Sequence, residues 1–189
     1  MHVIGSTFAL YSTSFFLIKP YFSEIRILNS LINSTLLSIY GIYYFGKMQE
    51  NSLLSDYITG YFVYDLYTGH FYDRQNFQLL TGYIHHNIYI TLLSYIRYTN
   101  QTYLINSFLP FEIPTALLDL RKMYRNSLLN SVFGVNFFAF RIIYNIYIVK
   151  KMYAISIYYS VISTSMLLVH GYWFYKWIKN RLQKNICNN

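Results

Sequence analysis

Apolar side chains occur along this chain in long blocks, and short polar or charged gaps separate the blocks. Each block is long enough for a helix of roughly 20 residues, the length that crosses the hydrocarbon core of a bilayer. The blocks cover about residues 3–18, 27–46, 53–71, 79–97, 102–119, 128–149 and 153–175. The pattern predicts an all-α, multi-pass membrane protein of about seven transmembrane helices. Because the gaps are short, we expect consecutive helices to pack as antiparallel neighbours within one membrane domain, residues 1–189.

Composition supports this interpretation. Hydrophobic residues make up 54% of the chain and charged residues 12%, whereas a soluble domain carries about 25% charged residues. The net charge of +8 does not indicate nucleic-acid binding, because the basic residues are spread over the gaps. The densest basic cluster is the tail, residues 176–189, which is typical of a cytosolic juxtamembrane segment; binding of anionic lipid is the alternative. The single cysteine, Cys187, excludes an intrachain disulfide.

The distribution of basic residues predicts the orientation of the bundle. Seven crossings place ten of them on one side, namely Lys19, Arg26, Arg74, Arg121, Lys122, Arg125, Lys176, Lys179, Arg181 and Lys184. The other side receives Lys47, Arg97, Lys150 and Lys151. Because the side richer in Lys and Arg is usually cytosolic, we expect a cytosolic C-terminus and a lumenal N-terminus. The first segment lacks a basic n-region, so we expect it to be retained.

Two glycosylation sequons bear on this topology. Asn100-Gln101-Thr102 lies in the gap before the fifth segment, on the side predicted to be lumenal. That gap is short, which disfavours modification. The sequon at Asn33 lies inside a predicted helix and should be silent.

Ionisable side chains inside the apolar blocks are the strongest indication of function. Each costs about 2.5–3.5 kcal/mol to insert, so such residues usually face the bundle interior and mark a site. They are Asp65, His85, His86, Glu112, Arg141 and His170. At 1.5 Å of rise per residue, four of them from four segments (Asp65, His85, Glu112 and His170) fall roughly 8–11 Å below the cytosolic surface. The sequence therefore predicts a polar site in one layer.

Helical spacing adds neighbours to this layer. Tyr61 and Asp65 share one face of the third segment, and His85 shares a face with Tyr89 while His86 points about 100° away. In the fifth segment Glu112, Thr115 and Asp119 line up along the helix. Pro110 and Pro114 flank Glu112 and should kink this helix. In the sixth segment Asn130, Gly134, Phe137 and Arg141 form one face.

Structural roles compete with functional ones at several of these residues. An Asp65–Arg141 ion pair could simply lock two helices together, and His170 could be a packing residue that hydrogen-bonds across helices. Trp173 and Trp177 fit an interfacial aromatic belt without chemistry. His85, His86, His170 and Glu112 could supply four zinc ligands, but adjacent residues on a helix diverge, so we expect no metal.

These residues also carry a family resemblance. Its parts, in order, are Asp56-Tyr-Ile-Thr-Gly-Tyr-Phe-Val-Tyr-Asp65, Ile84-His85-His86, Phe111-Glu112-Ile-Pro-Thr115, Leu118-Asp-Leu-Arg121, Phe137-Phe-Ala-Phe-Arg141 and Tyr172-Trp173-Phe174-Tyr175-Lys176. This ordered set, from about residue 50 to 180, resembles the TLC domain of the ceramide synthases and translocating-chain-associated membrane proteins, and is most similar to small TLC-domain proteins without an established sphingolipid reaction.

The resemblance implies a helical barrel around a lipid-accepting cavity, usually in the endoplasmic reticulum. In ceramide synthases the paired histidines mark an acyl-CoA-dependent N-acylation site with two acidic residues downstream. His85 and His86 match that pair and Glu112 matches the first acid, whereas Thr115 occupies the place of the second. This departure disfavours ceramide synthesis itself.

Three functions follow as hypotheses. The first is lipid binding in the cavity, in a role in lipid homeostasis, with membrane lipid as the partner, no cofactor and no nucleic acid. The alternative is an acyltransferase that takes acyl-CoA as co-substrate. In it His85 or His86 would be the base or nucleophile, Asp65 or Glu112 would orient the ring, and Tyr61, Arg141 and His170 would hold the substrate. A proton-linked transporter ranks last, since the sequence has no internal repeat.

Overall fold

Seven helical segments make up the computed structural model, in which residues 2–19, 24–47, 49–75, 77, 79–124 and 126–187 are described. Three segments are single α-helices, α1 (His2–Ile18), α2 (Ile25–Tyr43) and α3 (Ser52–Tyr72). The fourth joins η1 (Leu79–Ile84) to α4 (His85–Tyr98), and the fifth joins η2 (Thr102–Ser107) and η3 (Leu109–Phe111) to α5 (Glu112–Met123). The sixth combines α6 (Ser127–Asn136), η4 (Phe137–Tyr144) and α7 (Asn145–Tyr153), and the seventh is α8 (Ile157–Cys187). No strand occurs among these residues, so the all-α prediction and its seven segments are confirmed.

The fifth segment is broken where the sequence predicted a kink. Pro110 lies in the 3-10 turn η3, and the regular helix α5 begins at Glu112. Pro114 falls in the first turn of α5, where its missing N–H leaves no intrahelical bond unmade. The break therefore places Glu112 at the start of a helix.

Two π-helical stretches, η1 and η4, interrupt the fourth and sixth segments. A π-turn adds a residue to the helical repeat and rotates everything after it, and such turns recur at functional sites. Here η1 ends directly before His85, and η4 contains Arg141. Neither stretch was predicted, because helical periodicity in the sequence does not reveal a single inserted residue.

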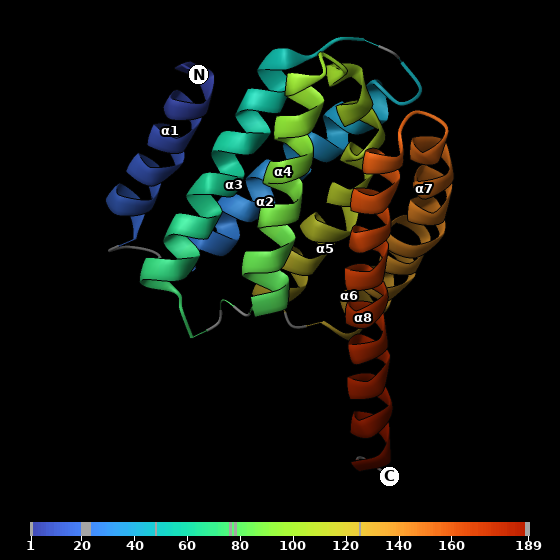
Figure 1. Cartoon of the computed structure of the whole chain (residues 1–189). Helices are drawn as coiled ribbons and strands as arrows, with labels where there is room; N and C mark the ends of the chain where they lie inside the picture. Colours follow the sequence, from blue (N-terminus) through green and yellow to red (C-terminus); the bar gives the residue numbers. More distant parts are fainter. Residues whose placement is uncertain are drawn as a thin grey trace.

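The last helix differs from its predicted bounds at both ends. The chain turns at residues 154–156, and α8 continues to Cys187. The predicted tail is thus the end of a helix, because no Gly or Pro after Gly171 stops it. This end projects beyond the bundle (Figure 1). Arg125, counted in the predicted orientation, lies outside the described residues, as do the side chains of Lys184 and Cys187.

Successive segments alternate in direction, but they do not all pack on their neighbours in the chain (Figure 1). Helix α1 packs chiefly on α3, and α2 packs chiefly on α5 and η3. Glycines permit both approaches: a Cβ on Gly60 would lie 2.7 Å from the carbonyl oxygen of Ile4, and a Cβ on Gly41 would lie 2.7 Å from Cβ of Leu109. Consecutive helices pack closely, as predicted, for α3 with α4, α5 with α6 and α7 with α8, whereas α1 with α2 and α2 with α3 make only minor contacts.

Polar and apolar side chains on α2 are distributed in the reverse of the soluble pattern. Its outward face carries exposed Ile32, Leu36 and Ile39, while Asn29 and Asn33 are buried. In a soluble protein the apolar stripe of a helix faces the core. Among the described residues, Ser127–Tyr153 is the one helix that by length and mean hydropathy could cross a membrane, and Val3–Ile18 is a shorter apolar helix.

Candidate functional site

A cavity of about 410 Å³ lies between the helices and contains most of the predicted site. Six of the seven predicted residues line it, namely Tyr61, Asp65, His85, His86, Glu112 and Arg141. Aromatic rings form much of the remaining wall, from Phe62, Phe77, Phe133, Phe137, Trp173, Phe174 and Trp177. The layer of ionisable groups from separate helices therefore converges on one space.

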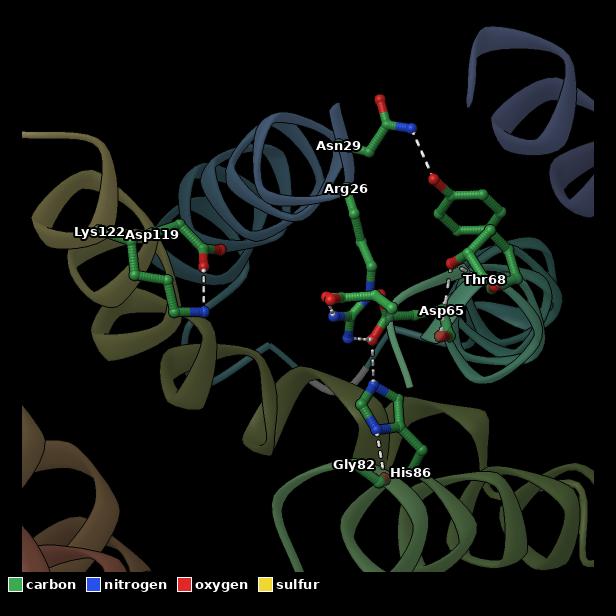
Figure 2. A network of polar contacts seen from close by, with 10 residues as sticks. Arg26, Asn29, Asp65, Thr68, Gly82, His86, Asp119 and Lys122 are labelled. Carbon is green, nitrogen blue, oxygen red and sulfur yellow. Dashed lines mark hydrogen bonds and ion pairs between the residues drawn. The ribbon is translucent and has the colours of Figure 1, made fainter. Parts of the chain in front are cut away.

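Asp65 is held on both of its oxygens. Arg26 donates from Nε to Oδ1 at 2.9 Å and from Nη2 to Oδ2 at 3.1 Å, and its Nη1 donates to Asp73 Oδ2 at 2.7 Å (Figure 2). Such a two-point contact between guanidinium and carboxylate is strong and directional. The predicted Asp65–Arg141 ion pair is therefore wrong, because Arg26 reaches inward from the first turn of α2 and takes that place.

His86 belongs to the same group. Its Nε2 lies 2.9 Å from Asp65 Oδ2, and its Nδ1 lies 2.7 Å from the carbonyl oxygen of Gly82 (Figure 2). Both partners are acceptors, so each ring nitrogen faces a group to which it can donate when it carries a proton. We call Arg26, Asp65, His86 and Gly82 the clamp. Its atoms have little hydrogen-bonding capacity left for a ligand.

His85 faces a different part of the cavity, and its ring is held by aromatic packing. The ring centroids of Tyr89, Trp173 and His170 lie 4.7, 4.9 and 5.9 Å from its own. No hydrogen bond joins either of its nitrogens to another described residue, and the ring lines the cavity. The predicted divergence of the two histidines is confirmed, and His85 is the one whose nitrogens are available.

Arg141 is a buried guanidinium without a carboxylate partner among the described residues. Only 4% of the residue is exposed. Its Nη2 donates to Thr115 Oγ1 at 2.6 Å, and Nη1 donates to His170 Nε2 at 2.7 Å. Its Nε has no acceptor. No described carboxylate contacts the guanidinium directly, and Glu112 acts on it only at longer range. Burying a cation without a direct ion pair is costly, so Arg141 Nε keeps capacity for an acceptor group.

His170 supports Arg141 from behind and does not line the cavity. It is fully buried. Because an arginine can only donate, His170 Nε2 accepts and the proton sits on Nδ1. The side-chain amide of Asn145 lies 3.1 Å from Nδ1, and its oxygen has no other partner, so that oxygen is the natural acceptor for the Nδ1 proton. His170 is therefore a positioning residue here and not the ligand contact we predicted.

Trp173 and Trp177, which were predicted to belong to an interfacial belt without chemistry, both line the cavity. The Trp173 indole N–H is buried without an acceptor. Trp177 occupies the space that Gly134 leaves open, with ring carbons 2.1–2.9 Å from where a Cβ would stand. The sequence missed this because aromatic residues near a helix end also fit a belt.

Two further cavity residues went unrecognised as site members. Asn33 was considered as a silent sequon, and Asp119 as a face-neighbour of Glu112. Each is 2% exposed, lines the cavity and carries a side-chain oxygen without a hydrogen-bond donor. The signal available in the sequence was their spacing, since Asn33 lies two turns after Arg26 on α2.

A metal centre is not formed by the residues described. No three His, Cys, Asp or Glu side chains among them are grouped so that they could hold an ion. Of the four residues in the zinc alternative, His86 contacts Asp65 and His85 packs on Trp173. Comparison with protein-family models, curated proteins and solved structures gives no match.

Proposed function

We propose that this protein is a multi-pass membrane protein whose helices span the bilayer and whose cavity binds a lipid, in a role in lipid homeostasis. Support comes from the reversed distribution of side chains, with buried Asn, Asp, Glu, Arg and His and a surface rich in exposed Leu, Ile, Phe and Tyr. Contiguous apolar surface of this kind is unfavourable in water. Several segments, such as α2 with 19 residues and α3 with 21, also have about the length that a bilayer requires.

The single observation that carries the lipid is Arg141. A buried guanidinium whose Nε has no acceptor, in an aromatic cavity, favours a ligand that combines an apolar body with an acceptor oxygen, such as the carbonyl, carboxylate or phosphate oxygen of a lipid. Trp173, beside His85, offers a second unused donor.

The cavity has a basic rim that supports the predicted orientation. Arg121 and Lys122 in the last turn of α5 and Lys176 on α8 line it. This is the side predicted to be cytosolic, where anionic headgroups and soluble acyl donors are found. The likeness to the TLC domain favours the endoplasmic reticulum as the membrane.

The test is the lipid that the purified protein retains. Protein extracted in mild detergent and examined by native mass spectrometry should carry about one lipid per chain. Arg141→Leu should reduce that occupancy at least tenfold, which corresponds to about 1.4 kcal/mol of binding free energy. The matched control is Arg74→Leu, an exposed arginine outside the cavity lining. A wild-type protein without lipid, or a fully loaded Arg141→Leu variant that melts normally, would refute the proposal.

A second function, acyl transfer, is favoured by His85 specifically. A neutral imidazole with free nitrogens in the cavity can accept the proton of an amine or hydroxyl as that group attacks the thioester carbonyl of acyl-CoA. The new bond forms to the acyl carbon, the carbon–sulfur bond breaks, and the thiolate leaves and takes up a proton. Purified protein given labelled acyl-CoA and a panel of amine and alcohol acceptors should then turn over, and His85→Gln should not. Absence of turnover across the panel removes this function and leaves lipid binding intact.

A further inference from the structure

The two walls of the cavity carry opposite chemistry. On one side Arg141 and Trp173 present unused donors. On the other, α2 and α5 present unused acceptors, Asn33 Oδ1 and Asp119 Oδ2. Helices α2 and α5 pack closely, and Ser30, one turn before Asn33, also lines the cavity. We call Ser30, Asn33 and Asp119 the acceptor wall.

We propose that the acceptor wall binds a primary ammonium group carried by a phospholipid headgroup, an inference that rests on the proposed lipid binding. A carboxylate oxygen and an amide oxygen that both lack donors match a group with several N–H bonds and a positive charge. A quaternary ammonium has no N–H to offer them. The two oxygens are enclosed at present, but the last torsion of Asp and Asn is soft, so a small rotation turns either toward the cavity.

Asp119 is the carboxylate with the right remaining capacity. Its Oδ1 accepts from Lys122 Nζ at 3.2 Å. Its Oδ2 has no partner at full hydrogen-bond geometry, and the Ser30 hydroxyl also lies near the carboxylate. Asp65, by contrast, has both oxygens taken by Arg26 and His86. Figure 2 shows Asp119 and Lys122 on their own helix, apart from that group. An ammonium ion would therefore add a second cation to Asp119, an arrangement that carboxylates commonly accept.

Lys122 also indicates where the phosphate would lie. Its side chain is 46% exposed, and with neighbouring Arg121 it lines the cavity near the end of α5. A headgroup whose ammonium and phosphate are joined by a short carbon chain can place the ammonium on Asp119 and the phosphate beside Lys122. The polar headgroup would then sit at the basic rim and its chains against the aromatic wall.

The experiment is a competition among lipids that differ in one group. Purified protein, stripped of lipid by exchange into detergent, is incubated with equal amounts of phosphatidylethanolamine, phosphatidylcholine and phosphatidic acid, and the retained lipid is quantified by native mass spectrometry. We expect about a tenfold preference for phosphatidylethanolamine over the other two. Asp119→Asn should bring the ratio close to one while total occupancy persists, because Arg141 still holds the lipid. Asn33→Leu should lower the ratio in the same direction.

Controls separate this inference from lipid binding itself. Glu24→Gln, an exposed acid outside the cavity lining, should leave the preference unchanged. A single-chain amine without phosphate should displace the phospholipid poorly; equal displacement would refute the phosphate position. If lipid is retained without a preference, or if Glu112→Gln abolishes the preference and Asp119→Asn does not, the acceptor wall is wrong while lipid binding stands. If the wild type retains no lipid at all, both proposals fail.

Discussion

The adjacent residues His85 and His86 lie in regions that differ in how many of their polar groups have hydrogen-bond partners. In the clamp around His86, each oxygen of Asp65 and both ring nitrogens are matched to partners at 2.7–3.1 Å. Around His85 the groups are unmatched: the imidazole makes no hydrogen bond to the described residues, and Arg141 Nε and Trp173 Nε1 have no acceptor. A fully satisfied polar network contributes to fixing a fold, and the unused capacity around His85 is the basis of the proposed lipid binding. The difference shows that a histidine pair in a sequence need not act as a pair.

Removing the carboxylate of the clamp should cause the largest loss of stability. Asp65→Asn removes the carboxylate that both Arg26 and His86 contact and leaves Arg26 only its ion pair with Asp73. Removing one partner of a buried ion pair costs about 3–5 kcal/mol, and the partly exposed Arg26 favours the lower end of that range. We expect the free energy of unfolding, measured by denaturant titration in mixed micelles, to fall by about 3 kcal/mol or more. Asp73→Asn is the matched control, since that partner of Arg26 is partly exposed and should cost less than about 1 kcal/mol. Equal losses at the two positions would contradict the clamp as a buried unit.

The seven segments were predictable because length, apolar composition and turn residues decide them locally. Predicted and observed bounds agree within a few residues from 3–18 through 102–119. The last segment was predicted to start four residues too early, and its basic tail was not recognised as helix. Both bounds lie where the sequence shows no clear change in its pattern of apolar and polar residues. The π-turns η1 and η4 could not be predicted, since they conserve the apolar pattern while rotating the helix.

The membership of the site was predictable, but its partnerships were not. Placing Asp65, His85 and Glu112 at one depth needed only helix rise and topology. Which base meets which acid depends on the packing of helices that are distant in the chain, such as α2 on α5. Arg26 was therefore counted as a charge in a gap between segments, and an ion pair with Arg141 was the structural alternative considered for Asp65. The useful signal was that Arg26 and Asp65 fall near the same end of antiparallel segments.

We call the part of the cavity around His85, Arg141, Trp173 and Trp177 the open region. There we expect the largest loss of stability from a change at Gly134, against which Trp177 packs. A Cβ there would lie 2.1 Å from the nearest ring carbon, so Gly134→Ala must displace the indole, and overpacking of this kind costs about 1–3 kcal/mol. We expect lower stability and altered lipid retention together, because Trp177 lines the cavity. Gly171→Ala on α8 is the control, because no atom lies within 4 Å of where its Cβ would stand, and it should be neutral or slightly stabilising. Normal stability of Gly134→Ala would show that Trp177 is not confined there.

The smallest expected effect is also the most direct comparison, the same substitution at the two neighbouring histidines. His86→Phe keeps a ring but removes the contacts to Asp65 and to the Gly82 carbonyl, leaving both acceptors short of a donor, at a cost of about 1–3 kcal/mol. His85→Phe preserves the aromatic packing on Tyr89 and Trp173 and removes no hydrogen bond to a described residue, so stability should change by no more than about 0.5 kcal/mol. Unfolding of both variants in the same micelles measures the difference. If the two variants lose equal stability, His85 has a structural partner and is not available to a ligand. If His85→Phe keeps its stability as expected, the function of His85 can be tested in a folded protein.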